Sequence, residues 1–153
     1  MTKEEILTRL TAAYTGPGSV DIVAVGLDGK APAQSVLDEA QVIVNAERPI
    51  GADAQVIPAV ETAVNVAAGV KLMDGGDLTA VRSAFGSALA AFCKENALRT
   101  DTVSYGKALR LLLDCDGVAD VSGFTVNGGT DSLTLATGAV PVAGTLNLTE
   151  VTA

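Results

Sequence analysis

The stretch from residue 62 to 72 constrains the fold of this chain most, because apolar and polar positions alternate along it. Its apolar members are spaced by two: Val64, Val66, Ala68, Val70 and Leu72. This period places successive side chains on opposite faces of a β-strand. The pattern predicts a long strand with one face in a core. The other face, with Asn65, Gly69 and Lys71, would meet solvent or a partner.

Two amphipathic helices are predicted after this strand. The first covers about residues 78–95, with Asp77 as its N-cap. Its apolar stripe has helical spacing: Leu78, Val81, Phe85, Leu89 and Phe92. A short extended piece at Thr102-Val103 leads to a second N-cap, Ser104. The second helix carries Ala108, Leu109, Leu112 and Leu113, and it ends at Asp116-Gly117.

The last third of the chain has β character. Residues 118–126 predict a strand, and Asn127-Gly128-Gly129 suits a tight connection because these residues tolerate positive φ. Leu133 and Leu135 alternate in a short second strand. Pro141 is expected to interrupt the ladder before the final alternation of Leu146, Leu148 and Val151. We expect these last segments to form a meander or hairpin.

The first third predicts a helix followed by a β-α-β unit. Thr2 and Glu5 have capping-box spacing, which favours a helix over residues 2–13, ended by the turn at 15–18. Residues 20–25 then predict a buried strand. A helix follows Pro32 and stops at Pro49; its stripe is Val36, Leu37, Ala40, Ile43 and Val44. Residues 54–57 form a short strand, and Pro58 marks a joint.

These segments predict an α+β fold with two small subdomains. The first, residues 1–60, contains the helix and the β-α-β unit. The second, residues 61–153, has the order β-α-α-β-β with one further strand. We expect mixed sheets with helices packed on one face.

The apolar content is unusual in kind. Apolar residues make up 48% of the 153, and small aliphatics dominate, with 25 alanines and 19 valines. Aromatic residues are only 3%, which argues against an aromatic-lined pocket or a base-stacking surface. Histidine is absent, which excludes Ser-His-Asp and Cys-His catalysis and imidazole metal ligands.

The charge balance disfavours nucleic acid and anionic membranes as partners. Eighteen acidic residues outnumber ten basic ones, for a net charge of −8. The first residues lack the pattern of a signal peptide, and no apolar run reaches the roughly 18 residues that span a bilayer. Cys93 and Cys115 fit neither a CxxC pair nor a disulfide framework. We therefore expect a soluble protein made in a reducing compartment.

Two loops resemble ligand sites only in outline. Gly75-Gly76 precedes a helix as an anion cradle does, but Asp74 and Asp77 flank it and would repel phosphate. A turn followed by a cap is the interpretation we adopt. Residues 114–117 start like a calcium loop, but the twelfth position is Thr125 rather than the required Glu. This favours a helix end followed by a turn.

No arrangement of residues predicts an active site. Lys71, Lys94 and Lys107 lack the apolar surroundings that would depress a lysine pKa. Tyr105 and Lys107 have the wrong spacing for a Tyr-x-x-Lys pair. We predict no catalytic, cofactor-binding or metal-binding residues and no cofactor, and hence no enzyme. The alternative is a small-ligand or metal site built from carboxylates alone, at Asp114, Asp116 and Asp120.

Taken in order, the segments resemble the C-terminal half of the baseplate J-like family of contractile phage tails. No single motif is specific, and the resemblance rests on order and spacing over about residues 15–151. The matching pieces are residues 17–22, 48–53, 56–59, the alternating strand 62–72, the polar stretch 99–104, residues 117–121 and residues 140–146.

The resemblance implies a structural role in a phage or prophage tail baseplate. Family members form wedge units around the central hub, so the implied partners are other wedge and hub proteins. Tailocins and other contractile injection systems share this machinery. The implied location is the virion tail baseplate, and the bacterial cytoplasm before assembly. Family members are about twice this length, so we expect a truncated, split or remnant form.

Self-association is a further expectation from the residues themselves. The alternating strand at 62–72 and the alanine-rich helix at 78–95 are its candidate contact elements, because small side chains allow close approach.

Overall fold

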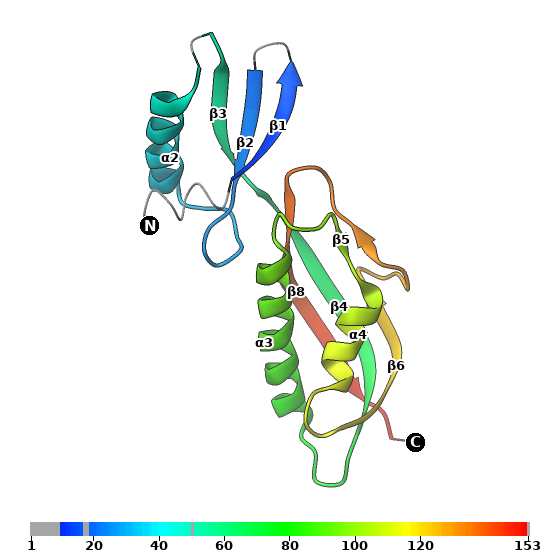
Figure 1. The fold of residues 1–153 in the computed structure, drawn as a ribbon. Helices are drawn as coiled ribbons and strands as arrows, with labels where there is room; N and C mark the ends of the chain where they lie inside the picture. The colour runs from blue at the N-terminus through cyan, green and yellow to red at the C-terminus, as the bar shows by residue number, and fades with distance from the viewer. Residues whose placement is uncertain (1–9, 17–18, 50, 153) are drawn as a thin grey trace.

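The computed structural model describes the backbone of residues 10–16, 19–49 and 51–152, and side chains from residue 19 onward. Its α+β architecture confirms the predicted fold class (Figure 1). In chain order the elements are β1 (Leu10–Gly16), β2 (Ser19–Ala24), α2 (Gln34–Glu47), β3 (Asp53–Pro58), β4 (Val60–Leu72), α3 (Leu78–Asn96), β5 (Thr102–Val103), α4 (Tyr105–Leu113), β6 (Val118–Val126), β7 (Leu133–Thr134) and β8 (Ala139–Glu150).

The larger sheet has the order β6-β4-β8 and is called the β4 sheet below. Its central strand confirms the predicted alternation, since Val64, Val66, Ala68 and Val70 are all buried. The residues between them lie on the opposite face. β6 pairs with β4 antiparallel, and β8 pairs with β4 parallel, so the sheet is mixed as expected.

Helices α3 and α4 cover one face of the β4 sheet (Figure 1). Val81, Phe85 and Leu89 of α3 are buried in the same core cluster as the apolar face of β4. Both predicted N-caps are confirmed. The Asp77 carboxylate accepts from Thr79 N–H at 3.0 Å, and the Ser104 hydroxyl accepts from Lys107 N–H at 3.3 Å.

The prediction of a C-terminal meander was wrong. β8 runs without interruption across Pro141 and pairs with β4, while β7 pairs with β5. Val60 N–H donates to Gly138 O at 3.1 Å, so the alternation along β8 turns Pro141 toward the outer edge. Proline has no N–H to donate, but on the outer edge no neighbouring strand would accept a hydrogen bond from it. Pro141 therefore costs the sheet no hydrogen bond, and the strand continues.

The smaller sheet has the order β1-β2-β3 and is called the β2 sheet below. The predicted strand-helix-strand at 19–58 is confirmed, with β2 and β3 parallel. Leu37, Ala40 and Val44 of α2 are buried against this sheet.

The helix predicted over residues 2–13 was wrong for residues 10–13. These belong to β1, which pairs antiparallel with β2 from Leu10↔Ala24 to Gly16↔Ser19. The capping-box residues Thr2 and Glu5 lie outside the described residues. Pairing with an adjacent strand outweighs a short helical pattern, because an isolated helix of this length is barely stable in water.

The two sheets meet where β3 passes into β4 at Ala59. Ala59, Val23, Val25, Ala97 and Val140 form one buried cluster with residues from both sides. The loop at 26–30 approaches the end of α3 so closely that a Cβ on Gly29 would lie 2.7 Å from Lys94 Cα. The division into subdomains 1–60 and 61–153 stays a prediction.

Candidate interaction surfaces

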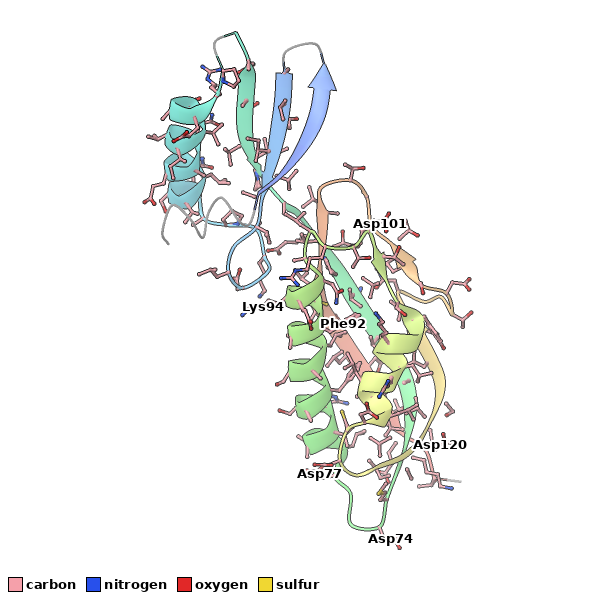
Figure 2. The ribbon with its side chains drawn as sticks, in the orientation of Figure 1. Asp74, Asp77, Phe92, Lys94, Asp101 and Asp120 are labelled. Carbon is pink, nitrogen blue, oxygen red and sulfur yellow. The ribbon has the colours of Figure 1, made fainter. Side chains whose placement is uncertain are left out.

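The three carboxylates that were candidates for a metal site, Asp114, Asp116 and Asp120, are exposed, and two of them have partners within the chain. Asp114 lies 3.4 Å from Arg110 across one helical turn, and Asp120 accepts from Val121 N–H at 2.8 Å. Asp74 and Asp77 lie at the end of the β4 sheet far from the β2 sheet, and Asp101 lies at the other end (Figure 2). Within the described residues, no group of three or more Asp, Glu or Cys side chains is arranged to hold a metal ion.

The loop at Gly75-Gly76 has the geometry of a turn followed by a cap. Gly75 has φ +80°, and Gly76 N–H donates to Met73 O at 2.8 Å. Asp77 then caps α3, as described above. The loop is therefore accounted for by the start of α3.

Both cysteines are free thiols. Burial raises the pKa of the Cys93 thiol to about 11. Burial also raises the pKa of Cys115, and the charges of Asp114 and Asp116 raise it further. A raised pKa lowers the thiolate fraction at neutral pH and makes both cysteines poor nucleophiles.

The lysines and the tyrosine have structural or surface positions. Lys71, Lys94 and Lys107 are exposed. The Tyr105 hydroxyl donates to Phe124 O at 2.7 Å, and the two rings meet edge to face with centroids 5.2 Å apart. Tyr105 thus ties α4 to β6.

A hollow of about 550 Å³ lies at the turn between α2 and β3, lined by residues that include Asn45, Arg48 and Asp53. The Arg48 guanidinium donates to Ala52 O at 2.6 Å and lies 3.8 Å from Asp53. The Arg48 side chain in this hollow therefore stabilises the turn between α2 and β3. No helix in the described part of the chain is long and apolar enough to cross a bilayer.

The face of the β4 sheet opposite the helices carries mainly small polar side chains, with Lys71, Asp120 and Val151 at one end. We call it the open face. It comprises Asn65, Ala67, Gly69 and Lys71 of β4, Ser122 and Thr125 of β6, and Thr145, Asn147 and Thr149 of β8. A shallow hollow of about 310 Å³ lies on it, with Asn65, Thr125 and Asn147 among its lining residues.

Two asparagines fix the register of the three strands at the open face. Asn65 N–H donates to the Asn127 side chain at 2.7 Å, whose amide in turn donates to Ala63 O at 3.1 Å. The Asn65 side chain accepts from Thr145 N–H at 2.9 Å. Asn127 has φ +49° and Gly128 φ +80°, which confirms the tight connection predicted there.

A second uncovered surface lies on helix α3, and we call it the α3 outer face. Its exposed residues are small and uncharged over three turns: Ala80, Ser83, Ala84, Ser87 and Ala91. Exposed helix faces usually carry charged side chains. The α3 outer face belongs to one of the two elements predicted to make contacts.

The other predicted contact element, residues 62–72, is available only through the open face. β4 lies between β6 and β8: β8 pairs with it from Val60 to Val70 and β6 from Val66 to Leu72, and the Asn127 side chain covers Ala63 and Asn65 on the β6 side. Strand addition at β4 is thereby excluded.

Side chains cover the outer edges of three edge strands. At β3, the Gln41 amide donates to Ala54 O at 2.8 Å and accepts from Val56 N–H at 2.7 Å, as a neighbouring strand would. At β8, Arg82 donates to Leu148 O at 2.9 Å. At β6, Tyr105 covers Phe124 O, and Val126 exchanges hydrogen bonds with Gly129. Such coverage prevents unintended strand pairing.

Sequence reasoning missed Gln41, Arg82 and Asn65 as positioning residues. Gln41 and Arg82 lie beside the buried stripes of α2 and α3, and their partners come from strands elsewhere in the chain. Asn65 offered a weak signal, because asparagine is disfavoured in the middle of a long strand.

A family model for the C-terminal domain of baseplate J-like proteins matches residues 64–149. This range begins within β4, ends within β8 and contains β6 and both helices of the β4 sheet. No curated protein matches the chain.

A solved structure shares the fold. The chain is similar to one in the cryo-EM structure of the anti-feeding prophage baseplate, 6-fold symmetrised, with a TM-score of 0.50 and 13% identity. The similarity covers 82% of this chain and 29% of that chain, so this chain spans less than a third of its structural neighbour. Because the family model covers more than half of its residues, the chain belongs to the baseplate J-like family, through that family's C-terminal domain.

Proposed function

We propose that this chain is a structural component of a contractile-tail baseplate and acts in wedge assembly through protein–protein contacts. The observation that carries the proposal is the family match over residues 64–149, which coincides with the β4 sheet and its two helices. The fold shared with a chain of a prophage baseplate supports it.

The open face and the α3 outer face are the proposed contact surfaces toward other wedge and hub proteins. Both are built mainly from small side chains, which lose little rotamer freedom when a partner covers them. They lie on opposite sides of the β4 sheet, so one chain can contact two neighbours at once. A subunit between two neighbours needs this arrangement.

The proposed role involves no catalysis. Family and neighbour are structural baseplate components. The raised pKa values of Cys93 and Cys115 and the engagement of Asp114, Asp120 and Tyr105 support a non-enzymatic role. We propose the assembled baseplate as its place of action, and the bacterial cytoplasm as its location before assembly.

Charged substitutions on the two surfaces test the proposal. The gene is deleted and complemented with Ala84→Glu, on the α3 outer face, or Asn147→Glu, on the open face. The matched control is Ala46→Glu, an exposed alanine of α2. We expect both surface variants to be depleted from purified tail particles and the control to be incorporated normally. Normal incorporation of all three variants would contradict the proposed surfaces.

A further inference from the structure

The loop at residues 26–30 follows β2 and lies beside Lys94 at the end of α3 (Figure 2). We call this loop the strap. Its shape is held by its own backbone, since Gly26 N–H donates to Lys30 O at 2.8 Å and Gly29 N–H donates to Gly26 O at 3.0 Å. The strap is therefore a compact unit that can move without losing these hydrogen bonds.

The strap covers the thiol of Cys93 without filling the space above it. A cavity of about 80 Å³ lies between the strap, α3 and β8, and its lining includes Asp28, Lys30, Cys93 and Lys94. Cys93 is 2% exposed, whereas the three charged residues are exposed to solvent. Water can therefore replace much of this contact, and contacts of this kind open locally at low cost.

The chain crosses from the β2 sheet to the β4 sheet between Ala59 and Val60. Ala59 N–H donates to Ala24 O, on the side of the β2 sheet. Val60 N–H donates to Gly138 O, on the side of the β4 sheet. A rotation between Ala59 and Val60 therefore keeps both hydrogen bonds. Ala59 is also the single residue between β3 and β4, the kind of position that absorbs the dihedral change in a hinge motion.

A hydrogen bond and a strained residue lie beside this crossing. Ala31 N–H, next to the strap, donates to the Glu61 carboxylate of β4 at 3.0 Å. Leu98, just after α3, has φ +58° and packs against the buried cluster that joins the two sheets. A leucine in the left-handed region persists only while its surroundings hold it there, and such residues cluster at switch regions. Opening the junction frees Leu98 to relax, which offsets part of the cost of opening.

We propose that the strap is a latch: when it lifts, the β2 sheet turns with α2 about Ala59, and the Cys93 thiol becomes accessible. Gly29 allows the closed form, because it has φ +79° and an added Cβ would lie 2.7 Å from Lys94 Cα. A larger residue at position 29 holds the strap away from α3. The latch rests on the contacts at the junction and does not depend on the baseplate role.

Thiol labelling of the full chain with dithiobis(nitrobenzoate), in the Cys115→Ala background, tests the proposal. Cys93 is then the only cysteine of the chain. We expect labelling that is faster than global unfolding allows and nearly independent of urea at low concentrations, because lifting the strap exposes little surface. A labelling rate that follows global unfolding at every urea concentration would overturn the proposal.

Two glycines of the same backbone conformation provide the matched comparison. Gly29→Ala should speed the labelling of Cys93 about tenfold or more, because the added Cβ pushes the strap off α3. Gly75→Ala strains the same left-handed conformation at the other end of α3, where nothing lies within 4 Å of the Cβ position. It should leave the labelling rate unchanged. Acceleration by Gly75→Ala would mean that the thiol reacts through global unfolding and would overturn the latch.

A second pair of variants tests the other contact of the strap region. Glu61 is exposed, so its substitutions should leave the fold intact. Glu61→Ala removes the acceptor of Ala31 N–H and should speed labelling about threefold, whereas Glu61→Gln keeps an acceptor oxygen and should label at the parental rate. No acceleration by either Gly29→Ala or Glu61→Ala would overturn the proposal.

Small-angle scattering tests the turn of the β2 sheet. The label on Cys93 keeps the strap lifted, so the labelled chain should have a larger radius of gyration than the unlabelled chain. An equal radius of gyration would contradict a turn about Ala59.

Discussion

The β4 sheet and the β2 sheet are built from the same small aliphatic residues, yet they differ in how much core they enclose. Among the residues whose side chains the structure describes, from residue 19 onward, seventeen buried residues form the cluster at the β4 sheet, including Phe85, Leu89 and Leu112. Five such residues, from β2, β3 and α2, form the cluster between the β2 sheet and α2. Within the described residues, two helices cover the first sheet and one covers the second. We therefore expect helix coverage, rather than composition, to decide which of the two sheets is more strongly stabilised.

Cavity-forming substitutions in the two cores test this difference and should give the largest effect. Phe85 is 0% exposed, and Phe85→Ala should lower the free energy of unfolding by about 3–5 kcal/mol. Leu37, in the smaller core, is 6% exposed, and Leu37→Ala should cost about 2 kcal/mol. Urea unfolding of both variants measures the two costs. An equal or larger loss for Leu37→Ala would contradict the comparison.

The junction between the sheets should give the next largest effect. Gly29 has φ +79°, and an added Cβ would meet the backbone of Lys94. Gly29→Ala should therefore cost about 2–4 kcal/mol, from backbone strain and displacement of the loop together.

The control for this prediction is Gly75→Ala. Gly75 has φ +80° but nothing within 4 Å of its Cβ position, so only strain remains, about 1 kcal/mol. Chemical denaturation measures both variants, and small-angle scattering reports whether the Gly29 variant becomes more extended. Equal costs would show that the loop does not press on α3.

Edge coverage of the β2 sheet supplies a smaller effect. Gln41→Ala removes two partly buried hydrogen bonds to β3 and should cost about 1–2 kcal/mol. Gln34→Ala removes an exposed hydrogen bond to Asp38 on the same helix and should change stability by less than about 0.5 kcal/mol. Thermal unfolding distinguishes the two. If they match, the Gln41 side chain does not stabilise the edge of β3.

At neutral pH a further effect vanishes, and it appears only in alkali. The Cys93 thiol, in the core of the β4 sheet, has its pKa raised from 9.0 to about 11 by burial. Between these values the unfolded chain loses the thiol proton and the folded chain keeps it. Stability therefore falls as pH rises from 9 toward 11.

Unfolding measured across this pH range in the parent and in Cys93→Ala checks the sign. The substitution should flatten the decline above pH 9. An unchanged slope would show that other groups cause it.

The fold could be predicted from the sequence best where one pattern extends over many residues. The alternation at Val64–Val70 and the stripe of Val81, Phe85 and Leu89 each repeat often enough to identify a strand and a helix. The helix predicted at residues 10–13 and the predicted C-terminal meander were wrong for the same reason. The structure of both segments depends on which strand pairs with which. That choice is made by contacts across the fold, and a local pattern does not record it.

The surfaces were harder to predict than the core. The open face was partly foreseen, because Asn65, Gly69 and Lys71 fall between the buried positions of β4. The α3 outer face was foreseen only as an alanine-rich helix. The hydrogen bonds by which Gln41 and Arg82 cover the edges of β3 and β8 join residues far apart in the chain. No rule based on sequence spacing predicts them.

Quantitative mass spectrometry of tail particles, purified from the bacterium that carries this gene, shows whether the chain is part of the baseplate. We expect peptides from residues 64–149 in intact particles, in a fixed ratio to the other baseplate proteins. Intact particles that contain every other baseplate protein but no peptide of this chain would contradict a structural role in the baseplate.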